Sequence, residues 1–226
     1  MELNLGYKFK DEQLLKTALT HTSFSHERKK KNLENNERLE FLGDAVLELV
    51  ISSYIFKTFN NLTEGQMTKL RASIVCEDSL AKKARQLNIG NHIWLGKGEF
   101  MTGGNNRDSI LADAFEAIIG AIYIDSNDIS KAQQFILTQM ADIIAEKRKT
   151  FELNDCKTYL QEIIQKHSVE PLKYEIIKEE GPAHEKTFTV QVSHKNKQLG
   201  TGTGKSKKDA EQSAAFEAIK MLKSKV

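Results

Sequence analysis

Two apolar segments, residues 36–46 and 109–121, constrain the fold most strongly, because each has the pattern of a buried helix. Apolar side chains recur in both segments at helical spacing. They are Leu39, Phe41, Leu42, Val46, Ile110, Leu111, Phe115 and Ile118. These residues are apolar enough to force both helices into a hydrophobic core.

Each of these predicted helices also carries a pair of carboxylates. A helix advances about 100° per residue, so Glu40 and Asp44 share one face and Asp113 and Glu116 share another. Four carboxylates at the wet edge of a core repel one another unless cations neutralise them. Oxygen-only clusters suit Mg²⁺ or Mn²⁺, the ions that assist phosphodiester hydrolysis. The pattern therefore favours a site for a hard divalent cation.

Two other interpretations of these acidic residues remain open from the residues alone. Glu37 and Glu48 extend the first pair into a continuous acidic stripe, which is also typical of a solvated helix face. Alternatively, Arg38 or Arg71 pairs with the carboxylates across helices, since residues 108–124 contain no Lys or Arg. The six histidines show no metal-ligand spacing, which disfavours zinc and iron sites.

The composition is that of an ordinary globular protein: 226 residues, 39% hydrophobic and 28% charged. Residues 155–226 hold 13 Lys and no Arg against 10 acidic residues, so the basic character belongs to the C-terminal third. The only cysteines, Cys76 and Cys156, are interpreted as reduced thiols, which predicts a cytoplasmic protein. No apolar run is long enough to span a bilayer, so no membrane partner is expected.

The pattern changes near residue 155 and divides the chain into two predicted domains. Residues 1–149 are predominantly helical, and 155–224 have the order α-β-β-β-α. The charged segment 146–155 marks a linker, placed at 150–154. The predicted fold is thus an all-α domain followed by a small α+β domain. Helices are expected at about residues 11–19, 35–59, 64–76, 77–87, 108–124, 130–149 and 206–223, strands at 173–178, 186–194 and 197–203, and a Gly- and Asn-rich loop at 96–107.

The last predicted helix opens with a basic run, Lys205-Ser206-Lys207-Lys208. Cations are unfavourable at the positive N-terminal end of a helix, and Asp209 offsets this only in part. With a phosphate present, the same arrangement becomes an anion site built from backbone N–H groups, helix dipole and ammonium charges. An ordinary solvated lysine run is the alternative interpretation.

Several motifs together resemble bacterial ribonuclease III, and the resemblance covers essentially the whole chain in that family's domain order. The most specific motif is Asn-Glu-Arg-Leu-Glu-Phe-Leu-Gly-Asp at residues 36–44. The others lie at residues 18–23, 62–65, 69–72 and 109–125.

The resemblance implies a role for each acidic residue that matches the family's pattern. The implied metal-coordinating set is Glu40, Asp44, Asp113 and Glu116. Asp44 and Glu116 are the implied catalytic residues, and Glu116 would bind the metal most directly. Glu37 and Glu64 match acidic family positions near the catalytic valley, with a less direct role.

Two residues of the same motif are implied to lie at a dimer interface. Gly43, inside a predicted helix, costs about 1 kcal/mol relative to Ala, which indicates close approach by another element. In this family that element would be the partner subunit. Phe41 matches a residue that plugs into the other protomer, so the resemblance implies a homodimer.

The second predicted domain resembles a double-stranded-RNA-binding domain. In that family, the first helix and a loop between strands touch two successive minor grooves, and the start of the last helix grips phosphates between them. The implied RNA-binding residues here are Thr158, Gln161, Glu162, Gln165, Pro182, His184, Lys205, Ser206, Lys207 and Lys208. Such recognition depends on duplex shape, so weak sequence preference is expected.

The resemblance as a whole implies an endoribonuclease that cleaves double-stranded RNA by Mg²⁺-dependent hydrolysis, with Mn²⁺ as a substitute. The implied products carry 5′-phosphate and 3′-hydroxyl ends with a short 3′ overhang, each protomer cutting one strand. The family processes rRNA, mRNA and tRNA precursors. The alternatives are a catalytically silent double-stranded-RNA-binding scaffold and an acidic protein–protein module tethered to an RNA binder.

Overall fold

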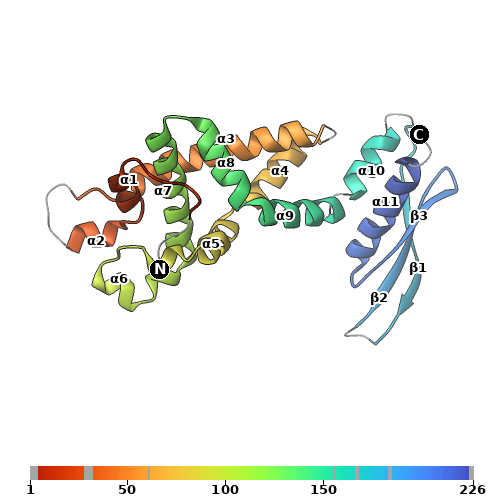
Figure 1. Cartoon of the computed structure of the whole chain (residues 1–226). Helices are drawn as coiled ribbons and strands as arrows, with labels where there is room; N and C mark the ends of the chain where they lie inside the picture. The colour runs from red at the N-terminus through yellow and green to blue at the C-terminus, as the bar shows by residue number, and fades with distance from the viewer. Residues whose placement is uncertain are drawn as a thin grey trace. The chain divides into compact units, whose positions relative to one another are not determined.

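The computed structural model describes residues 5–27, 33–60, 62–154, 156–165, 168–182 and 185–223. The chain divides into two units, Met1–Lys147 and Arg148–Val226. In the described ranges the first unit is helical, with one isolated β-bridge between Thr20 and Trp94, and the second combines helices with a three-stranded sheet (Figure 1). The predicted fold class, an all-α domain followed by an α-β-β-β-α domain, is confirmed.

Capping side chains fix the starts of several helices in the N-terminal unit. Thr63 and Gln66 form a reciprocal capping box at the start of α4, and Asp11 caps α1.

None of the helices in the described part of the chain combines the length and the apolar character that a membrane span needs. The α-helices, in chain order, are α1 (Glu12–Ala18), α2 (Thr22–Glu27), α3 (Glu37–Thr58), α4 (Glu64–Ile74), α5 (Glu77–Gln86), α6 (Lys97–Met101), α7 (Asp108–Ser126), α8 (Ile129–Gln139) and α9 (Ala141–Asn154).

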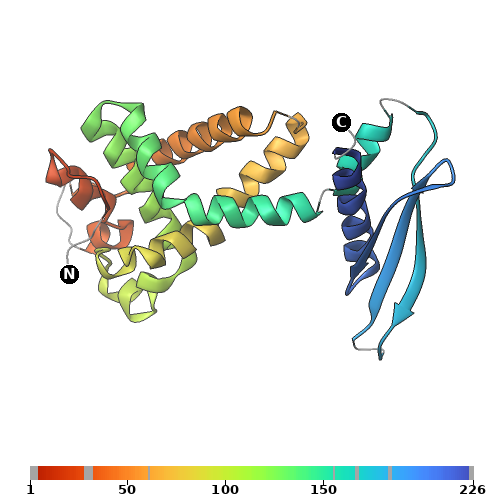
Figure 2. The ribbon, with the colours of Figure 1, turned by 45° about the vertical axis from the view of Figure 1, so that its right-hand side comes forward.

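Helices α3 and α7 lie side by side in the N-terminal unit and form its centre (Figures 1 and 2). The side chains of Phe115, Ile118 and Ile122 on α7 are fully buried, as are those of Leu47 and Ile51 on α3. Burial of such side chains is the main stabilising contribution to a core of this kind. The carboxylates of the two helices are therefore attached to the helices that build the core of the unit.

The expected single helix over residues 130–149 is two helices in the structure. Helix α8 ends at Met140, whose N–H donates to the Ile136 carbonyl at 2.8 Å and whose side chain is fully buried. Helix α9 then extends to Asn154 and includes residues 150–154, which we expected to be a linker. The charged residues 146–149 that precede this segment, and Glu152 and Leu153 within it, are good helix formers, in agreement with the helical conformation.

The expected loop over residues 96–107 also contains local helical structure. Helix α6 starts where the Glu27 carboxylate accepts hydrogen bonds from the backbone N–H groups of Lys97, at 2.9 Å, and Gly98, at 3.3 Å. The 3₁₀ turn η2 (Gly104–Asn106) follows, and η1 (Ile89–Asn91) precedes the segment. A carboxylate from a distant part of the chain supplies this cap, so the local pattern did not indicate the helix.

The C-terminal unit packs two helices on one face of an antiparallel sheet with strand order β1-β2-β3 (Figure 2). Lys195 and Asn196 connect β2 to β3 with positive φ angles, as in a two-residue hairpin turn. Its elements are α10 (Cys156–Gln165), β1 (Lys173–Glu180), β2 (Thr187–His194), β3 (Lys197–Gly204) and α11 (Lys207–Lys223).

Strand β3 approaches α11 closely because it carries glycine on the face that meets the helix. A Cβ added at Gly202 would lie 2.1 Å from the Ala214 nitrogen, and one added at Gly200 would lie 2.6 Å from the Ala218 nitrogen. Alanines on α11 complete the contact and are fully buried. This packing holds α11, and with it the basic helix start, in a defined position on the sheet.

Candidate active site and RNA-binding surface

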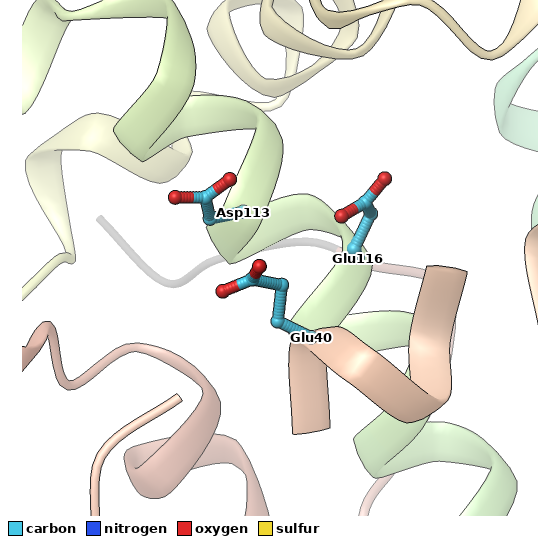
Figure 3. A group of neighbouring side chains, drawn as sticks. All are labelled: Glu40, Asp113 and Glu116. Atoms are coloured by element: carbon cyan, nitrogen blue, oxygen red, sulfur yellow. The ribbon is translucent and has the colours of Figure 1, made fainter. Parts of the chain in front are cut away.

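Three of the predicted metal-ligating residues converge at the rim of the N-terminal core. Glu40 comes from α3, and Asp113 and Glu116 come from consecutive turns of α7. Each offers a carboxylate oxygen, and these oxygens all lie within 4.8 Å of one another. Figure 3 shows the three side chains gathered where α3 and α7 meet.

Burial and mutual repulsion make these carboxylates hard to ionise together. Burial, followed by the charges of Asp44, Glu40 and Asp113, raises the pKa of Glu116 to about 8. Burial and then the Asp113 charge raise the pKa of Glu40. Burial also raises the pKa of Asp113, and the electrostatic effect of the nearby His21 offsets part of that rise. A cation bound among these oxygens would relieve the repulsion, and this is the setting a metal site requires.

One alternative was that Arg38 or Arg71 pairs with these carboxylates across helices, and the described part of the structure does not contain such a pair. Among the described residues, no Lys or Arg forms an ion pair with the carboxylates of Glu40, Asp113 or Glu116. Arg71 instead donates to the Ser52 hydroxyl at 3.0 Å. An all-carboxylate donor set without a protein counter-ion fits Mg²⁺ or Mn²⁺, which prefer oxygen ligands.

The other predicted acidic residues surround this cluster or lie apart from it. Asp44 is exposed and outside the group of three, yet its charge raises the pKa of Glu116. Glu37 is exposed, accepts a hydrogen bond from Asn35 at 3.1 Å, and raises the pKa of Glu40. Glu64, at the start of α4, lines a groove between α3 and α4 instead.

The predicted RNA-binding residues of α10 share its exposed side. Thr158, Gln161 and Gln165 are exposed and Glu162 is partly buried, whereas Leu160 lies in the core. The spacing of these polar residues puts them along one face of the helix, away from the sheet. Pro182, in the β1–β2 connection, is exposed, and His184 lies outside the described residues.

The basic helix start is also exposed, and Ser206 organises it. The Ser206 hydroxyl accepts from the Asp209 N–H at 3.1 Å and donates to the Asp209 carboxylate at 2.7 Å. Ser206 therefore serves as the N-cap of α11. Lys205, Lys207 and Lys208 remain exposed around this end, with the Lys207 ammonium 5.9 Å from the centre of the Phe188 ring.

Comparisons with known proteins match both units. Residues 11–144 match the ribonuclease-III-like family model, and residues 156–222 match the double-stranded RNA binding motif. The chain is 49% identical to ribonuclease 3 of Pelotomaculum thermopropionicum, over 95% of this chain and 89% of that protein. It is 50% identical to ribonuclease 3 of Desulforamulus reducens, over 98% of this chain and 90% of that protein. The chain belongs to the ribonuclease III family.

A solved structure supports the assignment of the helical unit. The nuclease domain of ribonuclease III from Campylobacter jejuni is 47% identical and has a TM-score of 0.57, covering 61% of this chain and 92% of that one. That structure shows flexibility in a region involved in dimer formation. As a member of the ribonuclease III family, this chain is an endoribonuclease that acts on double-stranded RNA. The family is metal-dependent, in agreement with the acidic cluster.

The structure corrects our explanation of Gly43. We expected a partner subunit to approach this residue, but the approach comes from α7 of the same chain. A Cβ added at Gly43 would lie 1.8 Å from the Glu116 carbonyl oxygen, and Gly43 is buried. Phe41, the other residue implied to contact a partner, is 80% exposed.

Three residues near the site were not identified as part of it from the sequence. His21, in the motif at residues 18–23, and Glu77, the first residue of α5, both act on the pKa of Asp113. Both are far from Asp113 in the chain, so no local spacing connects them with it. The third residue is Gly120, where the backbone of α7 directly contacts the backbone of α3. A glycine inside such an apolar helix is unfavourable, and that cost is the signal that could have identified it.

Proposed function

We propose that the chain cleaves double-stranded RNA by Mg²⁺-dependent phosphodiester hydrolysis at the acidic cluster. The products would carry 5′-phosphate and 3′-hydroxyl ends with a short 3′ overhang. The observation that carries this proposal is the convergence of oxygens from Glu40, Asp113 and Glu116 within 4.8 Å. Mn²⁺, which prefers similar oxygen ligands, should substitute for Mg²⁺.

The proposed roles follow from burial and position. Glu40, Asp113 and Glu116 hold the metal, and Asp44, exposed beside them, completes the ligand set from the solvent side. When bound, Mg²⁺ lowers the pKa of a water and offsets the charge that develops on the phosphate. Burial in the core and the charges of neighbouring carboxylates both act on Glu116. Removing its carboxylate should therefore disturb the site most.

A cleavage assay on a long RNA duplex tests this proposal. We expect cleavage in Mg²⁺, none in EDTA, and a loss of about a hundredfold or more for Glu116→Gln, because a misplaced or missing ligand costs at least that much. Glu12→Gln, which changes an exposed glutamate of α1, is the matched control and should cleave normally. Cleavage that survives EDTA or Glu116→Gln would rule out the proposed metal site.

We further propose that the exposed residues of α10, Pro182, His184 and the basic start of α11 form the surface that binds the duplex. Three ammonium groups around one helix N-terminus support a phosphate site. Changing Lys205, Lys207 and Lys208 together to Ala should weaken binding and flatten its dependence on salt, since fewer counterions are released. An unchanged salt slope would mean that these lysines do not meet phosphate.

We propose that the enzyme works as a homodimer joined through one face of α3. Phe41, Leu49 and Phe56 recur on that face and are 80%, 60% and 70% exposed. A groove of about 410 Å³ lies beside them, with Met67 and Arg71 of α4 in its lining. A two-fold axis across α3 would bring Phe41 of each protomer to the groove of the other.

We infer that the natural substrates are structured rRNA, mRNA and tRNA precursors, and that the enzyme acts in the cytoplasm. Reduced thiols at Cys76 and Cys156 suit a reducing compartment. Sequencing the fragments that the enzyme releases from total cellular RNA tests the substrate proposal. Fragments without duplex precursors would contradict it.

A further inference from the structure

Two glycines bring the acidic helices into direct backbone contact. A Cβ added at Gly43 of α3 would lie 1.8 Å from the Glu116 carbonyl oxygen and 3.0 Å from the Gly120 nitrogen. A Cβ added at Gly120 of α7 would lie 2.2 Å from the Leu39 carbonyl oxygen and 3.2 Å from the Gly43 nitrogen. The contact is reciprocal, so the two helices cross at this pair.

The crossing lies one helical turn from the converging carboxylates. Glu40 precedes Gly43 by three residues and Glu116 precedes Gly120 by four, and residues at these spacings share a helix face. Asp113 lies one turn further along the same face of α7. Side chains normally keep packed helices about 8–10 Å apart, and this crossing has no side chain between the backbones. The separation of Glu40 from the two α7 carboxylates therefore depends on the glycine pair.

We propose that Gly43 and Gly120 are positioning residues whose contact sets the spacing of the metal-binding carboxylates and thereby the affinity of the cluster for its cation. The inference rests on the metal site proposed above. A real Cβ seldom approaches another atom closer than about 3 Å, so a methyl group at either position forces the helices apart by about 1 Å.

A displacement of this size exceeds what a small cation tolerates. Mg²⁺ takes its ligand oxygens at about 2.0–2.1 Å in near-ideal geometry, and functional sites must hold their geometry to within about 0.5 Å. Separation of α3 from α7 would remove Glu40 from reach while Asp113 and Glu116 keep their relation along α7. The expected defect is thus loss of cation affinity, with secondary structure preserved.

Calorimetric titration of the full-length chain with Mn²⁺ alone tests the proposal without any RNA. We expect Gly43→Ala and Gly120→Ala to bind Mn²⁺ at least about tenfold more weakly than the wild type. Gly98→Ala is the matched control, because Gly98 is also helical but has open space around it. Leu80→Ala controls for general destabilisation, since Leu80 is buried in α5, and its Mn²⁺ affinity should be unchanged.

Circular dichroism and a cooperative thermal unfolding transition establish that each variant is folded. A folded Gly120→Ala or Gly43→Ala chain with wild-type Mn²⁺ affinity would overturn the proposal. Failure of both variants to fold would also contradict it, because the glycines would then serve the fold as a whole. Glu116→Gln separates the two proposals: if it too left Mn²⁺ affinity unchanged, the metal site itself would be wrong.

Discussion

Glu116 derives its chemistry from a helix that is otherwise almost entirely apolar. Its neighbours Phe115 and Ala117 are fully buried, so the carboxylate is held at the rim of the core with little freedom to turn into solvent. Burial and the charges of four further carboxylates, Asp44, Glu40, Asp113 and Glu48, raise its pKa to about 8. A protein tolerates such a group where a function requires it, because a neutral side chain would pack at lower cost.

Asp125, near the end of α7, is a carboxylate in the opposite situation. It accepts hydrogen bonds from the Tyr7 hydroxyl at 2.7 Å, the Lys10 N–H at 3.0 Å and the Asp11 N–H at 2.8 Å. Burial raises its pKa, but these hydrogen bonds outweigh burial and hold the pKa below its usual value. The charged form of Asp125 thus ties the N-terminal segment to α7.

We predict that Asp125→Asn lowers the free energy of unfolding by about 1 kcal/mol at pH 7, a small effect because the site is partly exposed. Because the pKa of Asp125 is lower in the folded state, its charge stabilises the fold at pH values above the ordinary pKa of about 3.9. This contribution is lost as the pH falls through the folded-state pKa. Urea unfolding at pH 7 and pH 3 measures the difference between variant and wild type. A difference that persists undiminished at pH 3 would contradict the assignment.

At the scale of whole elements, α5 and α9 are joined by two ion pairs that differ mainly in burial. The Lys83 ammonium, on a side chain only 7% exposed, lies 2.7 Å from the Asp142 carboxylate and 2.5 Å from the Gln86 amide oxygen. The Lys82–Glu146 pair is also 2.7 Å long, but its side chains are 47% and 54% exposed. Asp142 is 52% exposed, much like Glu146, so the same two helices compare a buried lysine with an exposed one.

We predict that Asp142→Ala lowers the free energy of unfolding by about 2 kcal/mol, because it leaves the buried Lys83 ammonium with only an amide partner. Glu146→Ala should cost less than about 0.5 kcal/mol, since water replaces the lost partner. Thermal or urea unfolding of the two variants checks the contrast. Equal losses would show that burial of Lys83 does not decide its contribution.

The sequence predicted the long elements well because their apolar periodicity reflects burial directly. Helices α3 and α7 and the three strands were located from spacing alone, and the carboxylate pairs followed from the same periodicity. The short helix α6 was not predicted, since its cap is the distant Glu27. The crossing of Gly43 with Gly120 was missed for a similar reason: a glycine inside a helix indicates a close approach, but the sequence around it does not identify the element that approaches.

At the scale of the whole molecule, one face of α3 exposes large apolar side chains to solvent. Phe41 is 80% exposed, far more than a large aromatic side chain usually is in a monomer. The groove beside Phe56 is part of the same unit. The proposed homodimer would cover both features, and it would supply one acidic cluster for each strand of a duplex.

We predict that Phe41→Asp weakens dimerisation by about a hundredfold, as expected for loss of an aromatic anchor at an interface. Sedimentation velocity over a range of protein concentrations measures the change. Phe100→Asp is the matched control, because Phe100 is 60% exposed on α6, away from α3. A dimer unaffected by Phe41→Asp, or equally weakened by Phe100→Asp, would be evidence against the α3 interface.

The most direct test of the central claim is a crystal of the full chain soaked with Mn²⁺ and measured at an X-ray energy where manganese scatters anomalously. Our account predicts a strong anomalous peak between Glu40, Asp113 and Glu116, with carboxylate oxygens about 2.2 Å from it. The same soak of Glu116→Gln should lose that peak. Manganese bound elsewhere, with these three carboxylates turned apart or protonated around an empty centre, would contradict the proposed catalytic metal site.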